Sequence, residues 1–278
     1  MALGVHSEVG KLHKVMVHRP GLEHRRLTPH NAGELLFDDV IWVDRAEQEH
    51  DAFVAVMRDR GVQVFEVEDL FAEALEKPEC KDWVLDSILG ERMVGTSASR
   101  RARDQMQVLG TSDWADFIIG GITKADLQRH LDGLLYQALD PTSTLVPPLP
   151  NFLYQRDPSC WIYDGVTLNP MAMPARKPET MIVEAVYKFH DMFKQDGQTP
   201  DIWLGGTAEE WGRVTVEGGD VEVIGHGSVL VGMGERTTPQ AVSLLARKLF
   251  VAGAATSVLA VRLPAARSSM HLDTVMTM

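Results

Sequence analysis

A chain of 278 residues with 45% hydrophobic content can bury a substantial core in one large domain or two, which excludes a disordered protein. The net charge of -12 and the pI near 5.3, without any run of Lys and Arg, exclude a general nucleic-acid binder and suit a small cationic substrate. The amino-terminal MALGVHSEVGKLHKV has no apolar run of signal-peptide or membrane-spanning length, and the sequence holds two cysteines, so we expect a cytoplasmic protein with no membrane partner.

The first part of the chain alternates strand and helix signals. KVMVHR at 14–19 is rich in β-formers, VDRAEQEHDAFVAVMRDRG at 43–61 is amphipathic, and VQVFEV at 62–67 is again rich in β-formers. This order predicts a repeating α/β unit.

A helical segment interrupts this pattern from residue 69 to about 138, where the β signal disappears. Thr123 and Asp126 have capping-box spacing, and a leucine stripe follows at Leu127, Leu131, Leu134 and Leu135. DPTSTLVPPLP at 140–150 then breaks the helix with four prolines. We therefore predict an α/β domain of residues 1–68 and 149–278, with an inserted helical domain and proline-rich return at 69–148.

Strand signals resume after residue 151 and continue to the end of the sequence. The segment 216–250 predicts two short strands joined around residues 225–227, followed by a helix that Thr238 and Pro239 begin. VLAVRLP at 258–264 and MHLDTVMT at 270–277 are predicted as further strands, and alternation would place His271 and Asp273 on one face. The last α/β unit is therefore expected to be incomplete at Met278.

Polar residues are dense near the ends of these strands, where α/β folds usually place their chemistry. Turn chemistry alone can explain each motif. Together they hold carboxylates, arginines and a histidine, in the segments NFLYQRDPS, MPARK, VEGGD, GMGERTT and MHLDT.

A guanidinium ligand would suit this set of side chains. A guanidinium presents five donors in a planar fork, which two carboxylates such as Asp157 and Asp273 can accept. Arg176 and Arg236 suit the carboxylate at the other end of free arginine. His271 could carry a proton, oriented by Glu217, so the set predicts an arginine site.

The longer motifs closely resemble those of the arginine deiminase family. They are NFLYQRDPSCWIYDGVTLNPMAMPARKPET, EGGDV, VGMGERTTPQAV and SMHLDTV, with LGVHSEVGKLHKVMVHRPG and RLTPHNAGELLFDDVIWV near the amino terminus. The resemblance covers nearly all of the chain. It implies the pentein fold, a five-module α/β propeller with a helical bundle inserted after the first module, here incomplete at the carboxyl terminus.

The resemblance also implies the reaction and the roles of individual residues. Family members hydrolyse L-arginine to L-citrulline and ammonia with no metal and no organic cofactor. By resemblance, Asp157 and Asp273 grip the guanidinium, and Glu217 and His271 assist proton transfer. The remaining predicted residues contact substrate or support the site: Leu36 on a loop near the pocket, Asn151, Arg176 and Arg236 at the amino-acid end, Tyr154 in the neighbouring wall where the family often has Phe, and Asp220 behind the site with Gly218 and Gly219.

The family's nucleophile, a cysteine near the carboxyl terminus that forms a thiouronium intermediate, has no counterpart in this sequence. Cys160 follows Asp157 by three residues in RDPSCWIY, and Cys80 lies in the helical insertion. Neither matches the nucleophile, and buried cysteine is usually a small hydrophobe. We therefore expect the chain as given to be carboxyl-terminally truncated and inactive.

Two alternatives to a deiminase stay open. The chain could bind arginine without turnover. A metal-dependent hydrolase could use His271 and Asp273 with Glu217 or Asp220, although a zinc site usually has more histidine or cysteine ligands. In each case the expected partner is a small molecule, L-arginine for the deiminase and the binding protein. No nucleic-acid partner is expected, and a homo-oligomer is allowed.

Overall fold

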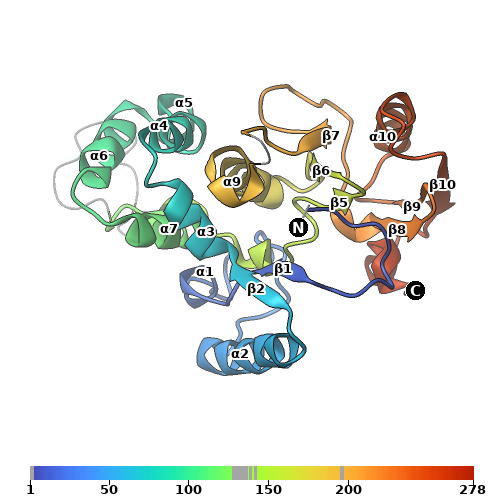
Figure 1. Cartoon of the computed structure of the whole chain (residues 1–278). Helices are drawn as coiled ribbons and strands as arrows, with labels where there is room; N and C mark the ends of the chain where they lie inside the picture. Colours follow the sequence, from blue (N-terminus) through green and yellow to red (C-terminus); the bar gives the residue numbers. More distant parts are fainter. Residues whose placement is uncertain (1–2, 127–136, 138–139, 141–142, 195–196) are drawn as a thin grey trace. The chain divides into compact units, whose positions relative to one another are not determined.

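The computed structural model describes residues 3–126, 137, 140, 143–194 and 197–278 (Figure 1). The chain divides into two compact units, which we call the helical unit (His13–Leu153) and the strand-rich unit (Met1–Leu12 with Tyr154–Met278). Both contain helices and strands, so the mixed α/β class is confirmed. The strands of the described segments form separate sheets of two or three strands, and the five-module propeller stays a prediction. No helix in these segments is both long and apolar enough to cross a membrane.

The helical unit begins with the predicted strand, helix and strand. β1 (Lys14–Val17) pairs in parallel with β2 (Gln63–Glu66), and α1 (Leu22–Arg25) and α2 (Val43–Asp59) lie between them in the chain. Parallel pairing requires such a crossover. In the described part of this unit, β2 is followed by α3 (Val67–Ala74), α4 (Pro78–Ser87), α5 (Glu91–Val94), α6 (Thr96–Met106) and α7 (Thr111–Gly120).

The end of the helical unit differs in one respect from the sequence prediction. A short antiparallel pair, β3 (Ile122–Thr123) and β4 (Thr144–Val146), enters the region expected to lack strands. The capping-box contacts are present, since the backbone N–H of Thr123 donates to Asp126 Oδ2 at 2.7 Å and that of Asp126 to Thr123 Oγ1 at 3.3 Å. The predicted leucine stripe lies outside the described residues.

The strand-rich unit contains two three-stranded sheets. In the first, β5 (Trp161–Ile162) pairs antiparallel with β6 (Gly165–Leu168), and β6 pairs in parallel with β7 (Asp201–Gly205) after the crossover helix α9 (Lys177–Phe189). In the second, the order is β10-β9-β8. Its elements are β8 (Val221–Gly225), β9 (Ser228–Met233), α10 (Pro239–Val251) and β10 (Ser257–Arg262).

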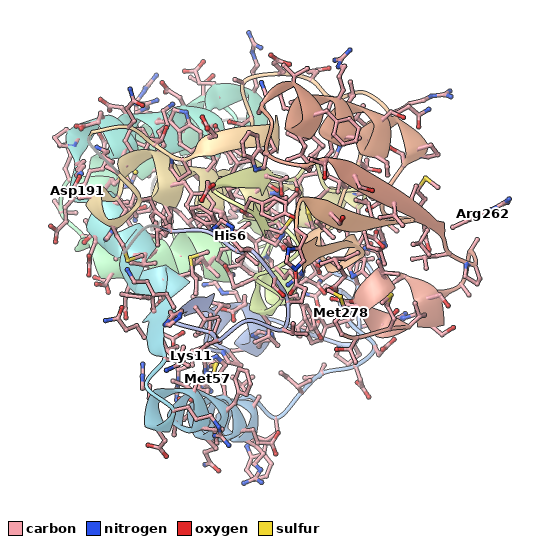
Figure 2. All side chains as sticks on the ribbon, turned by 45° about the vertical axis from the view of Figure 1, so that its right-hand side comes forward. His6, Lys11, Met57, Asp191, Arg262 and Met278 are labelled. Carbon is pink, nitrogen blue, oxygen red and sulfur yellow. The ribbon has the colours of Figure 1, made fainter. Side chains whose placement is uncertain are left out.

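The second sheet confirms the predicted hairpin and helix start. β8 and β9 are antiparallel around a turn at 226–227, and Thr238 accepts a hydrogen bond from the backbone N–H of Ala241 as the N-cap of α10. Alternating valines of β8 and β9 are buried with Leu245 and Leu249 of α10. At the end of β10, exposed Arg262 extends away from the sheet (Figure 2).

The strand predicted at 270–277 is wrong. The chain forms two 3-10 turns there, η5 (Arg267–Ser269) and η6 (Leu272–Thr274). The backbone N–H of Leu272, which a strand would use in a ladder, donates to Asp220 Oδ1 at 3.0 Å. Buried side-chain contacts therefore override the alternating pattern, and they place His271 in the interior and Asp273 at the surface.

Candidate active site

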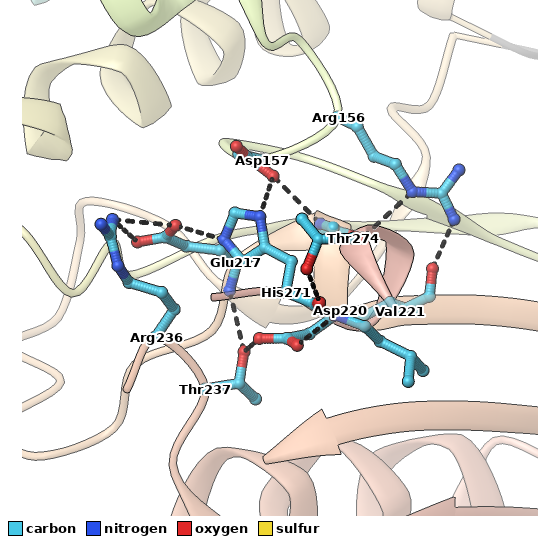
Figure 3. A network of polar contacts seen from close by, with 12 residues as sticks. Arg156, Asp157, Glu217, Asp220, Val221, Arg236, Thr237, His271 and Thr274 are labelled. Carbon is cyan, nitrogen blue, oxygen red and sulfur yellow. Dashed lines mark hydrogen bonds and ion pairs between the residues drawn. The ribbon is translucent and has the colours of Figure 1, made fainter. Parts of the chain in front are cut away.

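The polar cluster of Figure 3 lies in the strand-rich unit and joins segments far apart in the sequence. Asp157 precedes β5, and Glu217 lies directly before the 3-10 turn η4 (Gly218–Asp220). His271 lies directly before η6. The turn η2 (Pro174–Arg176) and the loop after β9 add Arg176 and Arg236. Five motifs from the sequence analysis thus meet in one place.

Glu217 and His271 form the central pair. The imidazole Nε2 donates to Glu217 Oε2 at 2.7 Å, and Glu217 is fully buried. Burial opposes both charges, yet the bond to His271 and the charge of Arg176 hold the pKa of Glu217 below its ordinary value. The same bond and the charge of Asp157 raise the pKa of His271, again against burial. The site therefore favours an ionised Glu217 beside a protonated His271. The His271 imidazolium is then a buried proton donor.

Three carboxylates surround the guanidinium of Arg176, which is itself buried. Its Nε and Nη2 donate to the two oxygens of Glu179 at 2.9 and 2.8 Å. Its Nη1 donates to Asp157 Oδ2 at 2.7 Å and lies 3.6 Å from Glu217 Oε2. Burial raises the pKa of Glu179 to about 7. Sequence reasoning missed Glu179, although its position three residues after Arg176 at the start of α9 is a usable signal.

Arg236 approaches the same pair from another segment. Its Nη1 lies 3.4 Å from both carboxylate oxygens of Glu217. Its buried Nε has no hydrogen-bond partner in the part of the chain that the structure describes. A buried N–H donor without an acceptor is costly, so Arg236 retains a donor that an acceptor group of a ligand could satisfy.

Gly219 lies beneath the two carboxylates that were predicted to grip a guanidinium. Its backbone N–H donates to Asp157 Oδ1 at 3.0 Å. A Cβ atom at this position would lie 2.9 Å from Asp273 Oδ2 and 2.6 Å from His271 Nδ1. A Cβ at Gly218 would lie 1.9 Å from the carbonyl oxygen of Arg156. Only glycine leaves room for these close approaches.

Asp220 is fully buried behind the central pair. Its Oδ1 accepts a hydrogen bond from the backbone N–H of Leu272, and its Oδ2 accepts one from the hydroxyl of Thr237. Burial raises the pKa of Asp220 to about 6. The motif GMGERTT indicated only its arginine as a site residue, and Thr237 was missed. Thr237 belongs to no helical or strand pattern in the sequence that could have indicated this contact.

A family model described as arginine deiminase matches residues 33–278. The chain belongs to the arginine deiminase family. Solved structures also resemble it, at low identity. DDAH from Pseudomonas aeruginosa, a Cys-to-Ser mutant complexed with citrulline, gives 14% identity and a TM-score of 0.48, with 94% of this chain and 64% of that chain covered.

Two further solved structures resemble this arginine deiminase family member. The adduct of a His-to-Gly mutant of dimethylarginine dimethylaminohydrolase with S-methyl-L-thiocitrulline gives 13% identity and a TM-score of 0.44, with 91% of this chain and 62% of that chain covered. SxtG, an amidinotransferase from Microseira wollei, gives 11% identity and a TM-score of 0.43, with 92% and 63% covered. The chain thus spans less than two thirds of the length of these three structures.

Three more residues were predicted from the arginine deiminase motifs, namely Leu36, Asn151 and Tyr154. Leu36, with a φ of 62°, and Asn151 belong to the helical unit, where Asn151 Nδ2 donates to the carbonyl oxygen of Leu35 at 2.6 Å. Tyr154 is exposed, and its carbonyl oxygen accepts a bond from the N–H of Asp157. Contact of these residues with substrate stays a prediction.

Neither cysteine has the properties of an activated nucleophile. Cys160 Sγ lies 3.1 Å from Thr167 Oγ1, and burial raises the pKa of this thiol to about 11. Such a thiol keeps its proton at neutral pH, whereas the thiolate is the reactive form. Cys80 is buried in α4 of the helical unit.

The cluster also contains three side chains that could ligate a metal ion. Among the described residues, Asp157, Glu217 and His271 offer ligand atoms within 4.8 Å of one another. The guanidinium groups of Arg176 and Arg236 already lie against these carboxylates. A metal cation bound at these three groups would be repelled by the two guanidinium charges.

Proposed function

We propose that this cluster binds L-arginine and takes part in its hydrolysis to L-citrulline and ammonia. The buried Glu217–His271 pair beside Asp157 is the observation that carries the proposal. A guanidinium needs carboxylate acceptors, and its hydrolysis needs a group that gives and takes protons next to the leaving nitrogen. Membership of the arginine deiminase family supports the same reading.

In this proposal Asp157 and Asp273 receive the substrate guanidinium. Arg176 Nη1 on Asp157 Oδ2 supports the assignment, because this carboxylate already accepts from a guanidinium nitrogen. Both carboxylates border Gly219, whose lack of a side chain lets them approach the backbone closely. The substrate guanidinium would share Asp157 with Arg176. Two donors of Arg176 are already bound to Glu179, so Arg236 is the better partner for the substrate carboxylate.

The proposed chemistry requires a thiolate that Cys80 and Cys160 do not supply. The thiolate forms a bond to the guanidinium carbon, and ammonia leaves with a proton from His271. Water then attacks the thiouronium carbon, gives a proton to His271, and the carbon–sulfur bond breaks to release citrulline and the thiolate. Glu217 holds the imidazole in place through both steps.

The proposal extends to the architecture. We propose that residues 1–68 and 149–278 contribute to a five-module α/β propeller and that 69–148 form its helical insertion. Helices α3 to α7 lie within residues 67–120, nearly all of which belong to that region. The two α/β crossovers in the strand-rich unit, through α9 and α10, support repeated modules.

A citrulline assay on the purified 278-residue chain tests the proposal. Arginine should bind without citrulline formation, because the cluster lacks a reactive thiol. Cys80→Ser and Cys160→Ser should leave this result unchanged. Sustained turnover that disappears in Cys160→Ser would mean that the nucleophile has been placed wrongly. Turnover that survives both substitutions would contradict the thiolate mechanism itself.

Arg236→Lys should weaken arginine binding about tenfold, about 1.4 kcal/mol. A lysine cannot present two parallel donors to the substrate carboxylate. Calorimetry with L-arginine and agmatine checks the assignment, since agmatine has the guanidinium but no carboxylate. Agmatine affinity should fall much less than arginine affinity. An equal loss for both ligands would show that Arg236 acts only through Glu217.

A further inference from the structure

The family resemblance assigns no role to Thr237, yet its hydroxyl bonds to both Glu217 and Asp220. We propose that Thr237 is a positioning residue, whose hydroxyl fixes Glu217 and His271 relative to each other. The catalytic meaning of this role rests on the proposed function. The positioning itself concerns the chain's own residues and can be measured without substrate.

The hydroxyl of Thr237 has two partners and both are buried. It accepts a hydrogen bond from the backbone N–H of Glu217 at 3.2 Å and donates one to Asp220 Oδ2. A hydroxyl can make both bonds at once because it has one hydrogen and two lone pairs. Thr237 thereby links the backbone that carries the Glu217 carboxylate to the side chain of Asp220.

Asp220 carries the link onward to His271. Its other oxygen, Oδ1, accepts from the backbone N–H of Leu272 at 3.0 Å, directly after His271 in the chain. The imidazole of His271 then returns to Glu217 at 2.7 Å, which closes a ring of contacts (Figure 3). The ring joins three segments, the first two of which are also linked by the backbone bond from the N–H of Thr238 to the carbonyl oxygen of Thr215 at 2.9 Å.

The packing around Asp220 leaves its carboxylate little freedom. A Cβ atom at Gly232 would lie 2.2 Å from Asp220 Oδ1, so β9 passes directly against this oxygen. Removing the Thr237 hydroxyl would leave Asp220 Oδ2 and the N–H of Glu217 without these buried partners. Unpaired buried groups cost about 1–3 kcal/mol each, so the segments would shift or Asp220 would take up a proton.

Protonation of Asp220 would lower the pKa of His271. The hydrogen bond from Thr237 lowers the pKa of Asp220 against the effect of burial, and the negative charge of Asp220 raises the pKa of His271. Loss of the hydroxyl should therefore raise the pKa of Asp220 and lower that of His271. The other charged groups around the imidazole are Asp157, Glu217 and Asp273, with Arg176 and Arg236 bound to Glu217.

The test is an NMR titration of the His271 imidazole, assigned with His271→Gln. Thr237→Val keeps the shape and removes the hydroxyl, and it should lower the pKa of His271 by about half a pH unit or more. Thr237→Ser should restore the wild-type value. Thr180→Val removes another buried hydroxyl bond of the same unit, to the carbonyl oxygen of Asn169, and should leave the His271 titration unchanged.

The outcomes separate the inference from the proposed function. An unchanged titration in Thr237→Val, or an equal change in Thr180→Val, would overturn the positioning role. If Thr237→Val does not fold, Asp220→Asn replaces it and should lower the pKa of His271 in the same direction, and an unchanged value would overturn the role as well. Arginine titration of the wild type is run in parallel: failure to bind arginine with the titration shift intact would reject the proposed function alone.

Discussion

Arg176→Met should lower the free energy of unfolding by about 3–5 kcal/mol, the usual cost of removing one partner from a buried ion pair. The substitution keeps an apolar chain of similar length but leaves Glu179 and Asp157 without their guanidinium. Glu217 would lose a positive charge 3.6 Å from its carboxylate. Urea denaturation followed by circular dichroism measures the change.

Two control variants interpret that result. Arg262→Met removes an exposed arginine of the same unit and should change stability by no more than about 0.5 kcal/mol. Arg176→Lys keeps the charge but cannot reproduce the two-bond contact with Glu179, so an intermediate loss is expected. If Arg176→Met unfolded at the same urea concentration as Arg262→Met, the buried network would not stabilise the fold.

Asp157→Asn should weaken arginine binding about 100-fold or more, corresponding to about 3 kcal/mol. The amide has no negative charge and offers one acceptor oxygen, while the native carboxylate serves both a guanidinium and the backbone N–H of Gly219. Calorimetry with L-arginine measures the loss, and circular dichroism confirms that the variant is folded.

Asp164→Asn is the matched control for this substitution. Asp164 is an exposed carboxylate of the same unit, 3.2 Å from His6 at the surface. Its loss should leave arginine affinity unchanged, because a surface ion pair contributes only about 0–1 kcal/mol. Near-native affinity in Asp157→Asn would remove the guanidinium-binding role from this site.

Local sequence signals predicted much of the fold, and they failed where long-range polar contacts decide the backbone. Residues 43–61 have a helical period and contain α2 (Val43–Asp59), and Thr238 with Pro239 begins α10 as capping rules require. Residues 270–277 have the period of a strand. However, the backbone N–H of Leu272 donates to Asp220, some fifty residues earlier in the chain. No window of local sequence contains both partners.

The candidate site shows the same limit. The chemistry of carboxylates, arginines and a histidine indicated the residue types, and the structure brings Asp157, Glu217 and His271 together. The spacing of Glu179 from Arg176 is compatible with their pairing, but nothing in the sequence indicates that Thr237 joins two segments. Pairing between side chains depends on the packed geometry, which residue type and spacing do not specify.

The central claim is that this cluster recognises a guanidinium, and a calorimetric titration of the 278-residue chain tests it most directly. L-arginine and L-lysine are titrated in parallel at neutral pH. Both carry a positive charge and the same amino-acid end, but an ammonium cannot satisfy two carboxylates with a planar fork. We predict that arginine binds at least about tenfold more tightly than lysine. Equal affinities, or no binding of arginine, would contradict the account.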